Sequence, residues 1–246
     1  MTPPFGVGLA FKHPAKGAAP FSPLDLPNLE LWLDASDTGG VDMTNLTTWL
    51  DLSGNGIDLD AQDGANVFHA TGGPNNQPYV GFSAGGLYRL SPLIAGADAA
   101  RTMFVVSRRG ADGCVCVFDG RYGFNGFAYT YGLATSNKRE VYLGGVAGEY
   151  DTGSNATNNW EKVCCINTGT GGSSGAQRFR LNGAERTLSA SNATEGASTL
   201  YFSVGGDHPS TLPLNGDVAE VIICSGVTSA DDIDLTEAYL LDKYGV

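Results

Sequence analysis

Oxygen-bearing side chains alternate along the run from Asp51 to Gly56, which reads Asp-Leu-Ser-Gly-Asn-Gly. This spacing matches the first half of a calcium-binding loop, in which alternate oxygen ligands converge on one cation and a glycine forms the bend. The twelfth position of such a loop is Gln62, which lacks the bidentate carboxylate. The run therefore predicts either a calcium site formed by Asp51, Ser53 and Asn55 or a β-turn held by Asp and Asn side chains. Calcium is the one cofactor that the sequence suggests.

Aromatic, acidic and amide side chains gather in two glycine-bounded stretches, 148–160 and 205–213. Aromatic rings can lie flat on a sugar ring while neighbouring polar groups bind its hydroxyls. We therefore predict rim loops that bind a glycan through Tyr150, Asp151, Asn155, Trp160, Asp207 and His208. The alternative is that Trp160 is a core residue at the start of a strand and that the polar residues only shape turns.

Catalytic constellations are incomplete in this sequence. A glycosidase needs two carboxylates that flank the scissile bond, and the segment from Glu149 to Asp151 starts such a pattern. Ser154 and Asn155 stand where the second acid belongs, and Gly148 and Gly153 predict that the segment is a loop. No Gly-x-Ser-x-Gly turn precedes a predicted helix, as the nucleophile turn of a serine hydrolase requires. We therefore expect a protein that is not an enzyme.

The charge of the chain limits the partners that it can bind. Of its 246 residues 26 are acidic and 14 are basic, which gives a formal net charge of -12. A surplus of acids argues against binding to nucleic acid or to an anionic membrane. The sequence holds no apolar stretch of the roughly 20 residues that cross a bilayer, and residues 1–19 do not form a signal peptide because prolines and glycines interrupt them. We expect synthesis in the cytoplasm.

The five cysteines are odd in number and lack the spacing of a disulfide framework or a zinc site. We expect them to be buried, reduced and packed as small apolar side chains. Two of them are adjacent in a predicted strand and must therefore point to opposite faces of its sheet. The five are Cys114, Cys116, Cys164, Cys165 and Cys224.

Glycine (35 residues) and proline (11 residues) are scattered between short apolar runs, which indicates many tight turns. Asn182 and Gly183 form a strong two-residue hairpin signal. Only 229–245 has helical spacing, with Ser229 as N-cap and Gly245 as the stop. The sequence therefore predicts an all-β fold, an antiparallel two-sheet jelly-roll sandwich with one C-terminal helix. The predicted strands are 29–34, 47–52, 78–82, 102–107, 114–119, 126–133, 140–144, 160–167, 177–181, 184–188, 200–205 and 217–224.

Residues 1–27 differ from the body at 28–246. They are rich in proline and glycine, and they carry basic residues but no acid before Asp25. Proline removes the donors that a sheet needs, so this segment predicts an extended arm, which is either disordered or docked on a neighbouring subunit. Four large apolar side chains favour docking, namely Phe5, Leu9, Phe11 and Phe21.

Several segments together resemble the concanavalin A-like lectin/glucanase superfamily, in its laminin-G-like or pentraxin-like jelly-roll branch. They occur in the order expected for that family over residues 28–246. They are LELWLDASD (29–37), WLDLSGNG (49–56), TMFVV (102–106), FRLNG (179–183), GDVAEVII (216–223) and AYLLDKYG (238–245). The resemblance implies a lectin-like β-sandwich, and such domains occur in secreted glycan-binding proteins and in the virions of tailed bacteriophages.

The missing signal peptide, the unpaired cysteines and the proline-rich arm favour the virion setting. We therefore expect a non-enzymatic structural protein of a phage virion, as a capsid decoration, tail or fibre component, that binds other virion subunits through its arm and binds host or environmental glycans. A homo-oligomer or a larger assembly would follow from subunit docking. The alternative is a free carbohydrate-binding module of a bacterial protein, with an extracellular location.

Overall fold

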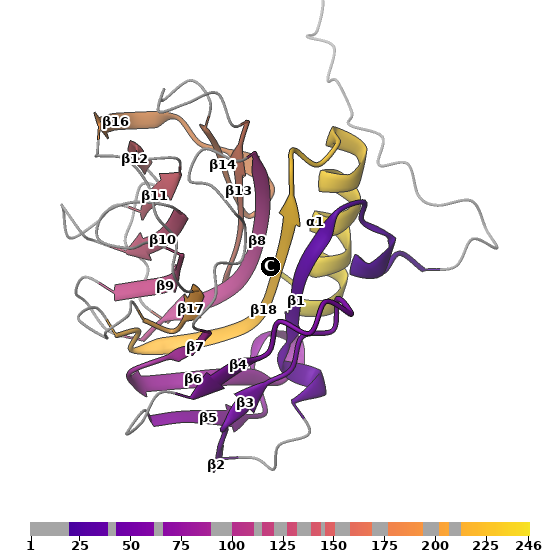
Figure 1. Cartoon of the computed structure of the whole chain (residues 1–246), viewed down its shortest axis with the longest axis vertical. Helices are drawn as coiled ribbons and strands as arrows, with labels where there is room; N and C mark the ends of the chain where they lie inside the picture. Colours follow the sequence, from indigo (N-terminus) through magenta and orange to yellow (C-terminus); the bar gives the residue numbers. More distant parts are fainter. Residues whose placement is uncertain are drawn as a thin grey trace, which may run out of the picture.

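The computed structural model shows two antiparallel sheets that face each other, with a helix outside one of them (Figure 1). This arrangement confirms the predicted all-β sandwich with a C-terminal helix. The structure describes residues 20–38, 43–61, 66–89, 100–110, 115–120, 127–131, 139–143, 146–150, 158–168, 177–193, 202–206 and 213–246.

Sheet A carries the helix, and its centre is the pair β8 (Arg101–Arg109) and β18 (Gly216–Ser225). One edge of β18 pairs with β8 along its length, and the other edge pairs first with β6 and then with β1, so β18 is enclosed by three strands. The other strands of sheet A are β1 (Leu29–Asp34), β2 (Thr44–Asn45), β5 (Asn66–Ala70), β6 (Tyr79–Ala84), β13 (Glu161–Asn167), β14 (Gln177–Leu181) and β15 (Ala184–Glu185).

Sheet B forms the opposite layer and runs from β16 at one edge to β3 at the other. Its strands are β3 (Thr48–Trp49), β4 (Leu59–Ala61), β7 (Leu87–Arg89), β9 (Val115–Asp119), β10 (Phe127–Tyr131), β11 (Arg139–Leu143), β12 (Val146–Tyr150), β16 (Leu188–Ala193) and β17 (Phe202–Val204). The expected single strand 184–188 is therefore wrong, because β15 belongs to sheet A and β16 to sheet B.

The loop prediction around Glu149 and Tyr150 is also wrong, because both residues lie in β12. This strand pairs with β11 on one side and β16 on the other. Gly148 weakens a strand locally, but hydrogen bonds from two neighbouring strands outweigh that weakness.

Two apolar clusters lie on the two faces of sheet A. Met103 and Val105 point to the inner cluster between the sheets, whereas Phe104 and Val106 point to the outer cluster beneath the helix. The adjacent cysteines divide in the same way, since Cys165 is inside and Cys164 is outside. This confirms that the two side chains point to opposite faces of the sheet and that both thiols are buried. Burial raises the pKa of each thiol. Cys224 is likewise buried and free, while the side chains of Cys114 and Cys116 lie outside the described residues.

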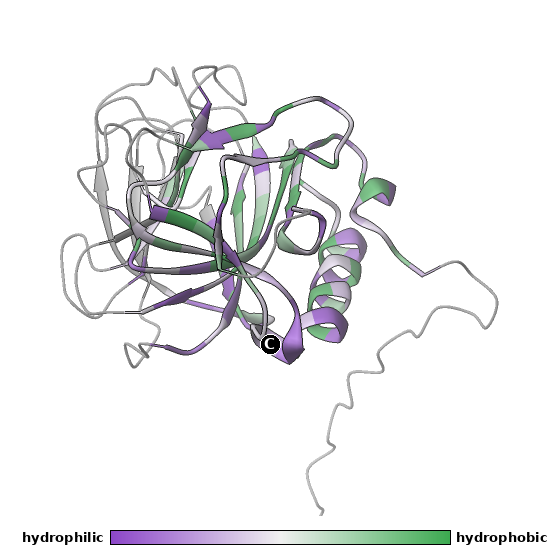
Figure 2. Ribbon diagram, turned by 90° about the horizontal axis from the view of Figure 1, so that it is seen from below, coloured by the Kyte–Doolittle hydropathy of each residue, from purple (hydrophilic) through white to green (hydrophobic). Residues whose placement is uncertain are grey.

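Helix α1 (Ala230–Tyr244) begins and ends as predicted. The Ser229 hydroxyl accepts from the backbone N–H of Asp232, and Gly245 takes a left-handed conformation at the C-cap. Ile233 and Leu240 are buried against sheet A. Figure 2 shows the helix outside the sandwich with hydrophobic and hydrophilic residues alternating along it. Three short 3-10 turns accompany these elements in the described residues, η1 (Pro23–Asp25), η2 (Ala35–Asp37) and η3 (Pro74–Asn76).

The end of the predicted arm packs on the chain's own body. The Phe21 ring lies 6.1 Å from the Tyr239 ring of α1, and Leu26 is buried in the outer cluster. A capping box at Ser22 fixes η1 between them. Phe21, predicted to dock on a neighbouring subunit, thus has an aromatic partner within the chain and is half-buried, and its docking on a subunit stays a prediction. Phe5, Leu9 and Phe11 lie outside the described residues.

Candidate functional site

The Asp51 carboxylate is saturated by hydrogen bonds from its own chain. Its Oδ1 accepts from the backbone N–H groups of Trp32 and Ser53, at 3.1 and 2.8 Å. Its Oδ2 accepts from the Ser53 hydroxyl and from the backbone N–H of Ile57, at 2.8 and 3.0 Å. The Asn55 amide donates to the carbonyl oxygens of Leu29 and Glu30. These hydrogen bonds therefore hold the turn at 51–56 against β1.

These contacts do not fit a calcium ion. A cation would need the oxygens of Asp51 to face it, but N–H and O–H donors already occupy both of them. The Asn55 side chain donates to two backbone carbonyl oxygens. Those oxygens could otherwise have been ligands of a cation. Within the described part of the chain, no group of three or more His, Cys, Asp and Glu side chains is placed to hold a metal ion. The geometry agrees with the β-turn alternative.

Four side chains from separate segments meet at one end of sheet A, on the face that also carries α1. Tyr79 starts β6, Arg108 is near the end of β8, Trp160 precedes β13, and Asp217 is near the start of β18. The rings of Tyr79 and Trp160 are 5.7 Å apart, edge to face, and both pack in part against the outer apolar cluster. We call these four residues the Trp160 cluster.

The strand register explains why Arg108 meets Asp217. Ser107 and Arg109 point inward toward Tyr131, so Arg108 between them points outward. Asp217 faces Arg108 across the β8–β18 pair. A side chain at Gly216 would overlap the carbonyl oxygen of Arg108, so glycine allows the two strands to lie close together here.

Arg108 links the charged and aromatic parts of the cluster. Its Nε donates to Asp217 Oδ2, and its guanidinium carbon lies 5.0 Å from the centre of the Trp160 ring and 5.4 Å from that of Tyr79. A cation in this position is attracted by the negative faces of the rings. Burial raises the pKa of Asp217, and the charge of Arg108 opposes that rise. The Arg108 side chain is 30% exposed and that of Asp217 is 12% exposed, so solvent reaches the pair.

Neutral polar groups surround the Trp160 cluster. Asn158 and Asn159 are exposed immediately before Trp160, and Asn215 is exposed two residues before Asp217. The backbone N–H of Asn158 donates to the Arg109 carbonyl at 2.6 Å, which ties this short segment to the end of β8. The cluster therefore combines half-buried aromatic rings with one ion pair, and exposed asparagines lie next to it in the sequence.

A buried ion pair joins the two sheets at the same end. Arg139 of β11 donates through Nε and Nη2 to the two carboxylate oxygens of Glu161 in β13, and the Nε contact is 2.8 Å. The side chains are only 2% and 6% exposed. The Tyr131 hydroxyl donates to Glu161 at 3.4 Å, and burial raises the pKa of that tyrosine. Because Glu161 directly follows Trp160, the ion pair also holds the backbone next to the indole ring in place.

The structure supports the predicted glycan residues unevenly. Trp160 lies immediately before a strand, as one interpretation proposed, but it is only half-buried and packs in part against the outer apolar cluster. Tyr150 ends β12 and pairs with Arg139 in the register, which brings its backbone to the same end of the sandwich. The side chain of Tyr150 lies outside the described residues, as do Asp151, Asn155, Asp207 and His208.

Tyr79, Arg108 and Asp217 were not predicted from the sequence as site residues. One signal was available for Arg108, because two arginines follow the apolar run 103–106 and mark the point where β8 ends. Nothing local distinguishes Tyr79 or Asp217, which join the cluster only through strand pairing.

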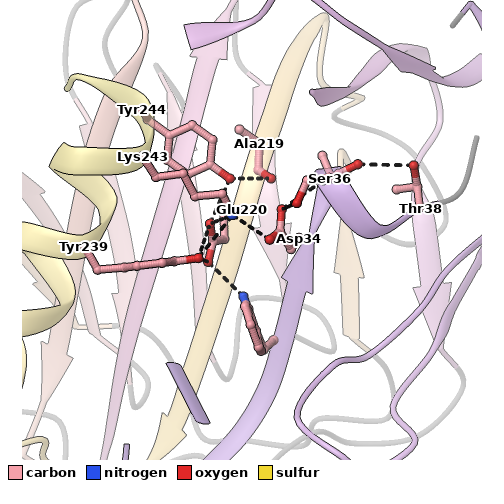
Figure 3. Close-up of polar contacts among 10 residues, drawn as sticks. Asp34, Ser36, Thr38, Ala219, Glu220, Tyr239, Lys243 and Tyr244 are labelled. Carbon is pink, nitrogen blue, oxygen red and sulfur yellow. Dashed lines mark hydrogen bonds and ion pairs between the residues drawn. The ribbon is translucent and has the colours of Figure 1, made fainter. Parts of the chain in front are cut away.

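A second polar group, the α1 clasp, is structural (Figure 3). We define it as Trp32, Asp34, Glu220, Tyr239, Lys243 and Tyr244. Lys243 Nζ lies 2.5 Å from Asp34 and 2.8 Å from Glu220, so one cation separates the two carboxylates. Glu220 also accepts from Trp32, Tyr239 and Tyr244 at 2.8, 3.0 and 2.8 Å. The clasp therefore holds the C-terminal end of α1 against β1 and β18.

The fold matches solved structures of β-sandwich domains. Trypanosoma rangeli sialidase in complex with sialic acid matches with a TM-score of 0.58 and 14% identity, over 89% of this chain and 34% of the sialidase. The receptor-binding domain of the botulinum neurotoxin C/D mosaic serotype matches with a TM-score of 0.59 and 10% identity, over 87% and 52%. The chain thus spans about a third of the sialidase and about half of the toxin domain.

A third match covers almost the whole of the other chain. It is domain 4 of AbnA, a GH43 extracellular arabinanase from Geobacillus stearothermophilus, in complex with arabinotriose. The TM-score is 0.57 and the identity 13%, over 85% of this chain and 98% of that domain. At these identities the matches show the fold alone. No protein-family model and no curated protein matches the sequence.

Membrane insertion through a helix finds no support in the described residues. None of the helices there is both long enough and apolar enough to span a bilayer.

Proposed function

We propose that this chain is a non-enzymatic carbohydrate-binding β-sandwich whose sugar surface is the Trp160 cluster. The observation that carries the proposal is the half-buried pair of rings, Tyr79 and Trp160, beside the solvent-accessible ion pair of Arg108 and Asp217. The arabinanase domain, which was solved with arabinotriose, supports it because almost the whole of that domain shares this fold.

The cluster offers what a sugar requires. An indole ring covers the C–H face of a sugar, while Asp217 accepts hydrogen bonds from hydroxyls and Arg108 donates to them. The exposed amides of Asn158 and Asn159 extend the polar rim. The carboxylates Glu161 and Glu220 are each held by a cation, which favours binding over hydrolysis.

Replacing Trp160 with alanine should weaken binding of a neutral oligosaccharide by about 10- to 100-fold, since the stacking surface and its contact with Arg108 are lost. Trp160→Phe should keep most of the affinity because it keeps an aromatic face. Isothermal titration against oligosaccharides chosen from a glycan array measures both changes.

The matched control is Tyr88→Ala, which removes a half-buried aromatic ring from sheet B. It should leave the affinity unchanged, and urea unfolding checks that all variants are folded. Absence of sugar binding, or binding that is indifferent to Trp160→Ala, would refute the proposal.

We further propose that the domain is a structural subunit of a phage virion, as a capsid decoration, tail or fibre component, with a free carbohydrate-binding module of a bacterial protein as the alternative. The proline-rich segment 1–19, which carries Phe5, Leu9 and Phe11, is the proposed contact with neighbouring subunits. Phe21 supports this, because its contact with α1 fixes the chain directly after this segment on the outer side of sheet A.

Deletion of residues 2–19 should abolish incorporation into particles while sugar binding stays intact, because Phe21 and the body remain. The measurement is the amount of the protein in purified particles of the phage that encodes it. Unchanged incorporation would rule out the anchoring role, and a gene that lies outside any phage genome would favour the free module.

A further inference from the structure

We infer that the Trp160 cluster selects neutral sugars with adjacent hydroxyls and rejects sugars that carry a carboxylate. The inference rests on the proposed function and assigns the ligand class to the same surface. It follows from how the charges of the cluster are already distributed among its own residues.

The positive charge of Arg108 is already balanced. Its Nε donates to Asp217, and its guanidinium lies against the rings of Trp160 and Tyr79. A sugar acid would need an uncompensated cation, and it would compete with Asp217 for this one. The four-residue cluster therefore carries no net positive charge to attract an anion.

The carboxylate of Asp217 repels a second carboxylate. It is only 12% exposed, so few water molecules screen it, and like charges at close range cost more where the local dielectric is low. Burial raises its pKa, which is the sign of a carboxylate that is short of solvation. A sugar hydroxyl supplies the missing donor, whereas a sugar carboxylate adds another acceptor. The formal net charge of -12 acts in the same direction at long range.

The hydrogen-bonding groups match a pair of hydroxyls. Within the residues that the structure describes, the ion pair uses Nε of Arg108 and Oδ2 of Asp217. The Nη groups of Arg108 are further donors and Oδ1 of Asp217 is a further acceptor, on two side chains that the ion pair already holds together. A hydroxyl both donates and accepts, so two neighbouring hydroxyls can bridge the pair. The nearby Asn158, Asn159 and Asn215 are neutral.

The test compares matched neutral and acidic polysaccharides, galactan and arabinan against polygalacturonate, by titration at about 0.1 M salt, where charges beyond about 10 Å are screened. We expect the neutral chains to bind at least about tenfold more tightly, which corresponds to about 1.4 kcal/mol. Asp217→Asn should bring the ratio of neutral to acidic affinity close to one, because the amide no longer repels a carboxylate. Asp242→Asn is the control, since it changes the net charge equally at an exposed position on α1 and should leave the ratio unchanged.

The outcomes separate this inference from the proposed function. Tight binding of polygalacturonate that Trp160→Ala abolishes would overturn the inference and keep the sugar surface. Binding of no sugar, or binding that Trp160→Ala leaves intact, would overturn both. If Asp242→Asn changes the ratio of neutral to acidic affinity as much as Asp217→Asn does, the selectivity comes from net charge, and the inference is overturned. Asp217→Glu, which keeps the charge, should preserve the ratio even if Asp217→Asn fails to fold.

Discussion

Glu161→Gln is expected to lower the free energy of unfolding by about 3 kcal/mol, because it leaves Arg139 as an uncompensated charge between the two sheets. The pair is bidentate and its side chains are 2% and 6% exposed, so water cannot replace the lost carboxylate. Equilibrium unfolding in urea, with the denaturant slope compared between variants, measures the change.

A matched control lies in the same sheet. Arg178 donates to Glu185 through two nitrogens at 2.9 and 2.8 Å, but these side chains are 49% and 46% exposed. Glu185→Gln should therefore cost less than about 1 kcal/mol. The double variant Arg139→Leu with Glu161→Leu should recover part of the loss, because no charge stays buried. Equal losses for Glu161→Gln and Glu185→Gln would contradict the role of burial.

Lys243→Met is expected to destabilise the protein by about 3 to 5 kcal/mol, because it leaves the carboxylates of Asp34 and Glu220 facing each other without their cation. The thermal unfolding midpoint should fall with it. Asp242→Ala alters the adjacent, exposed position of the same helix and should change stability by less than about 0.5 kcal/mol.

The loss in Lys243→Met should depend on pH in a defined direction. Burial raises the pKa of Glu220, and Lys243 opposes that rise, so removal of the lysine raises this pKa further. The folded variant then holds a proton that the unfolded chain releases at its ordinary, lower pKa. The stability from that proton is fully present below the unfolded pKa and is lost as the pH rises through the folded pKa. The deficit should therefore be smaller at pH 5 than at pH 8, and a deficit that grows on acidification would refute the mechanism.

Local chemistry made several elements predictable from the sequence. The hairpin between β14 and β15 turns at Asn182 and Gly183, which take φ values of 50° and 78°. These are the backbone conformations that the Asn-Gly pair favours, so two residues determine the turn. Helix α1 was equally predictable, because Ser229 caps its N-terminus and Gly245 ends it.

The sites were harder to predict because their members are distant in the sequence. Trp32 and Glu220 are 188 residues apart, and Arg108 and Asp217 are 109 apart. No local sequence pattern indicates that β8 and β18 are neighbours. Glu149 and Tyr150 were misjudged for the same reason, since the strands that hold β12 lie on both sides of it. Trp160 could be singled out because an indole near amides is unusual in itself, whereas Tyr79 becomes meaningful only beside it.

The enclosed position of β18 has a consequence for biosynthesis. On the ribosome, β1 emerges among the first strands and β18 emerges last, yet each is the other's partner. A nascent chain that stops before residue 216 exposes the edges of β1, β6 and β8 together, because the strand that joins them has not been made. Sheet A therefore closes only after β18 has been synthesised, and until then those edges are open to pairing with other chains.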